Sequence, residues 1–102
     1  MGVLSRPVIP EDCQHNAHLY YVLIDERFHR EAVLKAFKQA NIGAVFHYVP
    51  LHSAPAGLRY GRVAGELPVT DRAANRLIRL PLWVGLTPPE QDRVLEVLHS
   101  LR

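Results

Sequence analysis

The chain has 102 residues, 48% hydrophobic and 22% charged, which is typical of one folded domain and excludes a disordered tail. Its formal net charge is only +2, and acids alternate with bases, which argues against a nucleic-acid-binding surface. The single cysteine, Cys13, excludes an internal disulfide, and we find neither a signal peptide nor an apolar run that could span a membrane. These features predict a cytoplasmic protein.

Residues 1–16 contain Pro7 and Pro10 and show no helical period. We expect an extended arm or interdomain connection there, with a strand at its end. Residues 17–102 would then form a small C-terminal domain. Residues 19–24 are apolar, aromatic and bounded by polar residues, which predicts a buried strand.

Apolar residues recur at helical spacing between residues 28 and 40, at Val33, Ala36, Phe37 and Ala40. We expect Asp25 to cap this helix, and Asn41 and Gly43 to end it because both tolerate left-handed backbone angles. Residues 44–46 then predict a second strand.

Prolines and glycines are dense in residues 53–69, which predicts a long loop of the kind that is usually functional or disordered. Thr70 is expected to cap a short helix that places Ala74, Leu77 and Ile78 on one face. Residues 80–84 predict an extended segment, which Pro81 would confine to the edge of a sheet.

The last helix has the strongest start signal, a capping box from Thr87 to Glu90 with Pro88 at the first helical position. Its buried stripe is expected at Val94, Leu95, Leu98 and Leu101. The predicted fold class is α+β, with a small sheet and helices packed on one face.

Residues 46–53 hold the densest group of hydrogen-bonding side chains, which are His47, Tyr48, His52 and Ser53. A metal site is disfavoured, because residues 41–65 contain no Asp or Glu to serve as a further ligand. Two interpretations stay open for the histidines. Their rings hydrogen-bond the backbone of a tight turn, or they donate to oxygens of a polar or anionic ligand, presented by a loop that Pro50 stiffens.

The other candidates have simpler explanations. If residues 47 and 48 are extended, His47 and Tyr48 point to opposite faces. His18 with Asn16 is expected to form hydrogen bonds at a strand entry, and Trp83 to lie in the core or an interface. His29 and His99 are expected on helix surfaces, and residues 61–65 lack the strand and helix that flank a phosphate loop.

Catalytic groups are sparse. The two lysines, Lys35 and Lys38, fall on the exposed face of the helix at 28–40, whereas a Schiff-base lysine needs a partly desolvated pocket. No spacing indicates a Ser-His-acid set. We therefore assign no catalytic, cofactor-binding or metal-binding residue to this chain.

Three segments, residues 15–21, 43–52 and 80–82 with 86–87, resemble in order the C-terminal domain of the DegT/DnrJ/StrS-type sugar aminotransferases. The resemblance covers about residues 13–101. Within the family, residues 44–61 are most similar to the branch that forms dTDP-4-amino-4,6-dideoxygalactose in enterobacterial common antigen synthesis.

The resemblance implies a pyridoxal-phosphate enzyme of aminotransferase fold type I that acts as a homodimer. It would transfer an amino group from glutamate to a dTDP-4-keto-6-deoxyhexose in surface polysaccharide or lipopolysaccharide synthesis. The Schiff-base lysine and most cofactor contacts would lie in a large N-terminal domain that this chain lacks, so the chain alone is expected to be inactive. The match carries over His47 and His52 as residues lining the nucleotide-sugar side of the active site, with Tyr48 and Ser53 as weaker candidates.

The alternative is a free-standing α+β module that binds or senses a small molecule without catalysis. Such a module would need a sealed core and a self-complementary interface. The aminotransferase interpretation instead predicts apolar surface left bare where the large domain packs.

Overall fold

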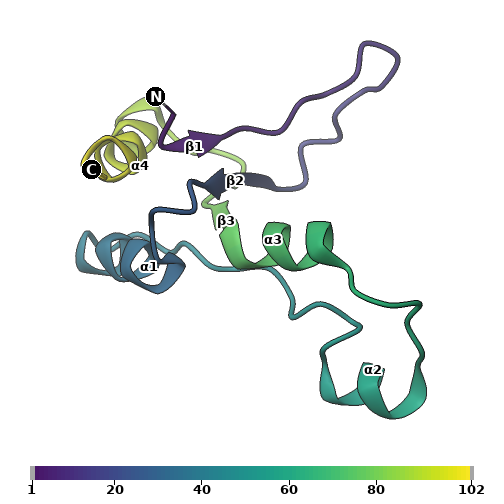
Figure 1. Cartoon of the computed structure of the whole chain (residues 1–102). Helices are drawn as coiled ribbons and strands as arrows, with labels where there is room; N and C mark the ends of the chain where they lie inside the picture. The colour runs from purple at the N-terminus through teal and green to yellow at the C-terminus, as the bar shows by residue number, and fades with distance from the viewer. Residues whose placement is uncertain (1, 102) are drawn as a thin grey trace.

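Three antiparallel strands in the order β1-β2-β3 form the sheet of the computed structural model, which describes residues 2–101 (Figure 1). The strands are β1 (Leu4–Ser5), β2 (Tyr20–Ile24) and β3 (Leu77–Leu80). The helices are α1 (Arg30–Gln39), α2 (Pro55–Tyr60), α3 (Pro68–Arg76) and α4 (Pro88–His99). The predicted α+β class is confirmed.

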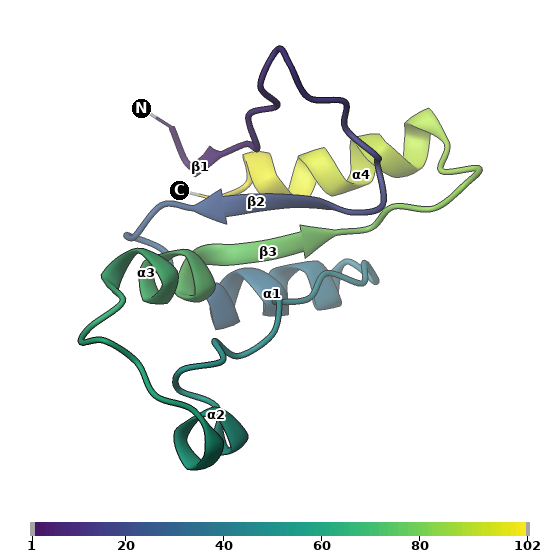
Figure 2. The same cartoon turned by 90° about the vertical axis from the view of Figure 1, so that its right-hand side faces the viewer.

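The core lies between one face of the sheet and helices α1 and α4, which lie together behind β2 and β3 in Figure 2. Side chains alternate across a strand, so β2 and β3 send every second residue toward these helices. The buried core residues are Val22, Ile24, Val33, Phe37, Ile78, Val94 and Leu98. Helices α2 and α3 are not part of this layer, and α2 stands away from the sheet (Figures 1 and 2).

The N-terminal arm differs from the prediction, because its strand is at the beginning and not at the end. Leu4 pairs with Ile24 of β2 and packs against the core. Pro7 and Pro10 follow it and lack the N–H that would extend the ladder. Residues 6–19 therefore leave the sheet and return to it at Tyr20, one residue after the predicted start of β2.

Helix α1 lies within the predicted range, but Asp25 does not cap it. The N-cap is His29, while Asp25 accepts hydrogen bonds from the backbone N–H of Arg27 at 3.0 Å and from its Nε at 2.9 Å. The backbone bond first, and then the guanidinium bond, lower the pKa of the Asp25 carboxyl. Asn41 has φ 57°, the left-handed angle that ends the helix as expected.

The predicted loop at residues 53–69 contains helix α2 and the start of α3. Both helices begin with a proline, Pro55 and Pro68, at a position where a missing N–H costs nothing. The N-cap of α3 is Leu67, so the prediction that Thr70 caps the helix was wrong. Pro55 and Pro68, which we had interpreted as loop residues, are therefore the first residues of two helices.

The strands after residue 40 are also displaced. Leu77 and Ile78, predicted on a helix, belong to β3, and the strand ends before Pro81. Of the predicted extended segment at residues 80–84, only Leu80 belongs to a strand. The strand predicted at 44–46 is reduced to one antiparallel bridge, in which Val45 and Arg79 exchange backbone hydrogen bonds of 3.2 and 2.7 Å.

Helix α4 follows the prediction closely. Val94 and Leu98 are buried and Leu101 packs against the core, but Leu95 is 46% exposed and Val97 packs in its place. Both the backbone N–H and the hydroxyl of Thr87 donate to Glu90 Oε2, each at 2.8 Å. No helix within residues 2–101 is both long and apolar enough to cross a membrane.

The capping box yields the first prediction. The two hydrogen bonds from Thr87 lower the pKa of the Glu90 carboxyl in the folded protein. These bonds therefore stabilise the fold at pH values above the pKa that Glu90 has in the unfolded chain. The stabilisation is lost as the pH falls through the lower pKa of the folded state. Thr87→Ala should destabilise the domain by about 1 kcal/mol at neutral pH. The difference in Tm from the parent, measured by circular dichroism, should shrink in acid. A difference that grows in acid would contradict this assignment.

Candidate functional site

Residues 46–67, between the Val45 bridge and helix α3, leave the sheet and include the residues singled out in the sequence (Figure 1). We call this segment the excursion. Arg30 contacts the start of this segment. Its guanidinium lies over the Phe46 ring, 4.8 Å from the ring centroid, and its Nη1 donates a hydrogen bond to the Ala74 carbonyl. The Arg30 side chain is only 18% exposed. Arg30 therefore joins α1, the excursion and α3 at one point.

A tight turn follows at residues 50–54. The Pro50 carbonyl accepts from the backbone N–H of Ser53 at 3.1 Å, from that of Ala54 at 3.0 Å and from Ser53 Oγ at 3.2 Å. The Ser53 hydroxyl proton is thus used inside the turn. The turn leads directly into α2 and orients His52, which lies within it.

Gly57 allows helix α2 to pack on this turn. A Cβ built on Gly57 would lie 1.6 Å from the Leu51 carbonyl oxygen and 2.7 Å from its carbon. Both are backbone atoms, which cannot move aside without moving the turn. Only glycine permits this approach.

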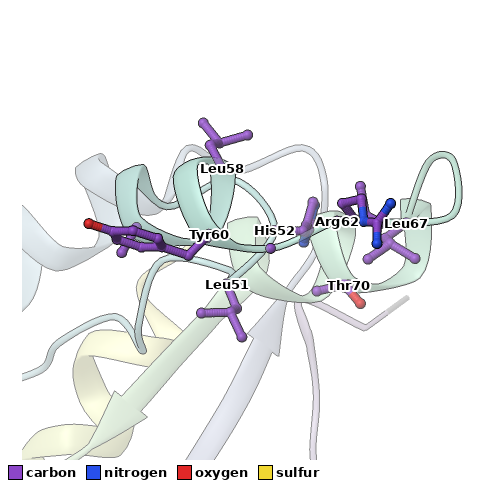
Figure 3. A pocket seen from close by; sticks show the side chains of 11 residues that line it. Leu51, His52, Leu58, Tyr60, Arg62, Leu67 and Thr70 are labelled. Atoms are coloured by element: carbon purple, nitrogen blue, oxygen red, sulfur yellow. The ribbon is translucent and has the colours of Figure 1, made fainter.

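The turn, α2 and the start of α3 surround an open groove of about 860 Å³ (Figure 3). Most of its lining is apolar, with His52, Tyr60, Arg62 and Thr70 as the residues that carry polar groups on their side chains. A concave, mostly apolar surface with a few polar groups is typical of a ligand-binding site.

His52 pairs with an acid outside the group of residues singled out in the sequence. Its Nε2 lies 2.8 Å from Oδ1 of Asp71, in the first turn of α3, and its side chain is 18% exposed. The His52 ring therefore lies at ion-pair distance from a side chain, and the hydrogen bonds that close the turn do not involve it. Residues 41–65 contain no carboxylate, but the fold supplies one from residue 71.

His47, Tyr48 and Ser53 do not line this groove. The rings of His47 and Tyr48 meet edge to face, with centroids 5.3 Å apart, so the expectation that they point to opposite faces was wrong. The segment is not a strand, which is why the alternation of an extended chain does not hold. Both side chains are exposed.

The remaining candidates lie where the sequence placed them. His18 Nδ1 and Asn16 Oδ1 are 2.7 Å apart just before β2, and His29 and His99 are exposed. Trp83 is 51% exposed, so it is not a core residue, and its place in an interface stays a prediction.

Gly57, Arg62 and Asp71 were missed as site residues. A sequence signal existed for Asp71 only, since an acid three residues after Pro68 suits the first turn of a helix. The approach of Gly57 to Leu51 and the placement of Arg62 in the groove depend on how α2 packs, which no local pattern reports.

The lining of the groove includes no lysine for a Schiff base and only one histidine that could bind a metal. Lys35 and Lys38 are exposed on α1 and do not line it. Within the described part of the chain, no three His, Cys, Asp or Glu residues are grouped as metal ligands. The residues present therefore do not fit a pyridoxal-phosphate site of their own.

Large apolar side chains are exposed along the excursion and helix α3. They are Phe46, Tyr48, Val49, Leu51, Leu58, Tyr60, Val63 and Val69. Exposed large apolar side chains in this number along one segment are the feature expected where a domain packs against another protein part.

Comparison with known proteins agrees with this picture. Residues 2–99 match the DegT/DnrJ/EryC1/StrS aminotransferase family. The chain is 29% identical to the dTDP-3-amino-3,4,6-trideoxy-alpha-D-glucose transaminase of Micromonospora megalomicea, over 96% of this chain and 26% of that protein. It is 27% identical to the spore coat polysaccharide biosynthesis protein SpsC of Bacillus subtilis, over 96% and 26%.

Solved structures show the same fold. The crystal structure of S. venezuelae DesV in complex with a ketimine intermediate superposes with a TM-score of 0.84 at 25% identity, covering 97% of this chain and 26% of that one. An aminotransferase from Brucella abortus gives 0.82 at 24% identity, covering 96% and 26%. The chain thus spans about a quarter of the length of these relatives, and it belongs to the DegT/DnrJ/EryC1/StrS aminotransferase family.

Proposed function

We propose that this chain is the C-terminal part of a pyridoxal-phosphate-dependent nucleotide-sugar aminotransferase. The intact enzyme would transfer an amino group from glutamate to a dTDP-4-keto-6-deoxyhexose for surface polysaccharide or lipopolysaccharide synthesis. The match of residues 2–99 to the family, at about a quarter of the relatives' length, supports the placement.

The observation that carries the proposed role is the groove that His52 lines (Figure 3). Its apolar wall suits the faces of a base or deoxysugar, while His52, Arg62 and Thr70 supply groups for hydroxyl or phosphate oxygens. In our proposal the excursion is one wall of the sugar-nucleotide site, with His52 as its principal contact. His47, Tyr48 and Ser53 stay weaker candidates, on surfaces that only the intact enzyme would bring to the substrate.

The partner in this proposal is the large N-terminal domain, which would cover the apolar side chains of the excursion in a homodimeric cytoplasmic enzyme. Residues 1–16 would connect the two domains, although β1 also closes the edge of the sheet. From the similarity of residues 44–61 we further propose that the enzyme belongs to the branch serving enterobacterial common antigen synthesis.

Pyridoxal phosphate would be held by the rest of the protein, because neither lysine of this chain lies in the groove. When bound, the cofactor supplies the electron sink for amino-group transfer. This chain would contribute substrate binding and orientation. A free-standing sensing module is the less supported alternative, since the exposed apolar excursion is not the sealed surface that such a module needs.

The test replaces His52 with alanine in the intact enzyme. We expect kcat/KM for the sugar nucleotide to fall roughly tenfold to a hundredfold, as for the loss of a ligand hydrogen bond. Cofactor affinity, measured from its absorbance band, should not change.

His99→Ala is the matched control, because His99 is exposed at the end of α4 and does not line the groove. It should leave both measurements unchanged. If His52→Ala also leaves both unchanged, the excursion has only a structural role.

A further inference from the structure

Arg30 is the first residue of α1, and its side chain contacts the residue where the excursion begins and the helix that follows it. Its guanidinium lies 4.8 Å from the centroid of the Phe46 ring, and its Nη1 donates to the Ala74 carbonyl. Ala74 is among the last four residues of α3, where a helix leaves carbonyl groups without regular partners and favours a nearby cation. Arg30 thus links α1, in the core layer, to both ends of the excursion.

Helix α3 carries this link to the groove. Thr70 lines the groove and lies one helical turn before Ala74 on the same side of α3. Asp71, which lies 2.8 Å from His52, is in the same helix. Successive turns of a helix are joined by their backbone hydrogen bonds, so fixing Ala74 also fixes Thr70 and Asp71.

Stability alone does not account for an arginine at this position. The side chain is 18% exposed, and its Nε is buried without a hydrogen-bond acceptor among the described residues. A buried donor without a partner destabilises the fold. The ion-pair contact, from Nη2 to Glu31 Oε1 at 4.0 Å, involves a carboxylate that is 82% exposed and contributes little. Replacing buried ionic groups by apolar side chains of similar volume is often neutral or stabilising.

We propose that Arg30 is a positioning residue for the substrate-binding excursion. It holds Phe46 and α3 against α1, and so sets the spacing between the turn that contains His52 and the first turn of α3. The inference rests on the proposed function of the excursion and extends it to a residue outside the groove. Arg30 does not line the groove, so it acts on the ligand only through the residues that do.

The experiment uses the intact enzyme with Arg30→Met, which keeps an unbranched apolar stem and removes the charge and the donors. KM for the dTDP-sugar should rise about tenfold, with kcat changed much less. Backbone hydrogen exchange, followed by mass spectrometry, should become faster in residues 46–76 and stay unchanged in α4. Arg30→Lys should restore part of both properties, because an ammonium group can still contact the Phe46 ring or the Ala74 carbonyl.

Arg27→Met is the matched control. The Arg27 guanidinium also lies over a phenylalanine ring, 5.4 Å from the centroid of Phe28, but its hydrogen bonds go to Asp25 and Gly2. This variant should change neither KM nor the exchange of residues 46–76.

His52→Ala separates the two hypotheses. If it raises KM while Arg30→Met leaves either KM or the exchange of residues 46–76 at the parent's value, the inference about Arg30 is wrong. Faster exchange in α4 with Arg30→Met would also overturn it, since Arg30 would then support the whole fold. If His52→Ala leaves KM unchanged, the proposed function of the excursion fails, and the exchange alone decides whether Arg30 holds the excursion in place.

Discussion

Replacing Gly57 with alanine is expected to detach helix α2 from the turn at Leu51 while the core stays folded. The new methyl group would lie 1.6 Å from the Leu51 carbonyl oxygen, so helix and turn must separate. Overpacking of this kind costs typically about 1–3 kcal/mol, and here the separation can relieve it locally. His52 belongs to the same turn, so kcat/KM for the sugar nucleotide in the intact enzyme should fall at least about tenfold.

Two measurements on the Gly57→Ala protein separate local from global damage. Trypsin should cut after Arg59, an exposed residue of α2, faster than in the parent. The circular dichroism melt should still show one cooperative transition, because the buried core residues lie between the sheet, α1 and α4.

Gly43→Ala is the control for a glycine substitution in itself. Nothing lies within 4 Å of a Cβ at Gly43, so alanine should be tolerated there. If Gly57→Ala behaves like Gly43→Ala in both proteolysis and catalysis, α2 does not pack on Leu51 as described.

The second large effect is the absence of activity in the 102-residue chain alone. We expect no saturable pyridoxal-phosphate absorbance band, no covalent adduct after borohydride reduction and no transamination of a dTDP-sugar by glutamate. The physical reason is that Lys35 and Lys38 are exposed on α1, outside the partly desolvated pocket that a Schiff-base lysine needs.

Surface lysines also react slowly with aldehydes, so the experiment needs a reference. The same chain unfolded in urea gives the adduct level of unstructured lysines, and the native chain should not exceed it. A saturable, stoichiometric adduct that is lost on Lys35→Arg or Lys38→Arg would contradict the prediction. The intact enzyme serves as the positive control for the band and for turnover.

Local sequence patterns were sufficient to predict several elements of the fold. Helices α1 and α4 and strand β2 were predicted to within a few residues, since each buries a face whose period is visible in a single segment. The capping box at Thr87 was also correct, because both of its partners lie within one helical turn.

Other elements were misplaced because local signals were ambiguous. Pro55 and Pro68 fit a loop and the first position of a helix equally well. Leu77 and Ile78 fit a helical face, but pairing with Leu23 and Val22 of β2 places them in a strand. Leu4 joined the sheet because Ile24 offered it a partner, which the sequence of the arm did not reveal.

For the site, the sequence by itself determined the family resemblance and identified residues 46–53 as the densest group of hydrogen-bonding side chains. The tertiary structure alone decided that His52 faces a groove and pairs with Asp71, that Gly57 packs on Leu51, and that His47 and Tyr48 stay outside. The physical reason is that hydrogen bonds and steric exclusion act between atoms a few ångströms apart. Folding brings the side chains of residues 52 and 71 within 2.8 Å of each other. No periodic pattern in the sequence predicts this contact.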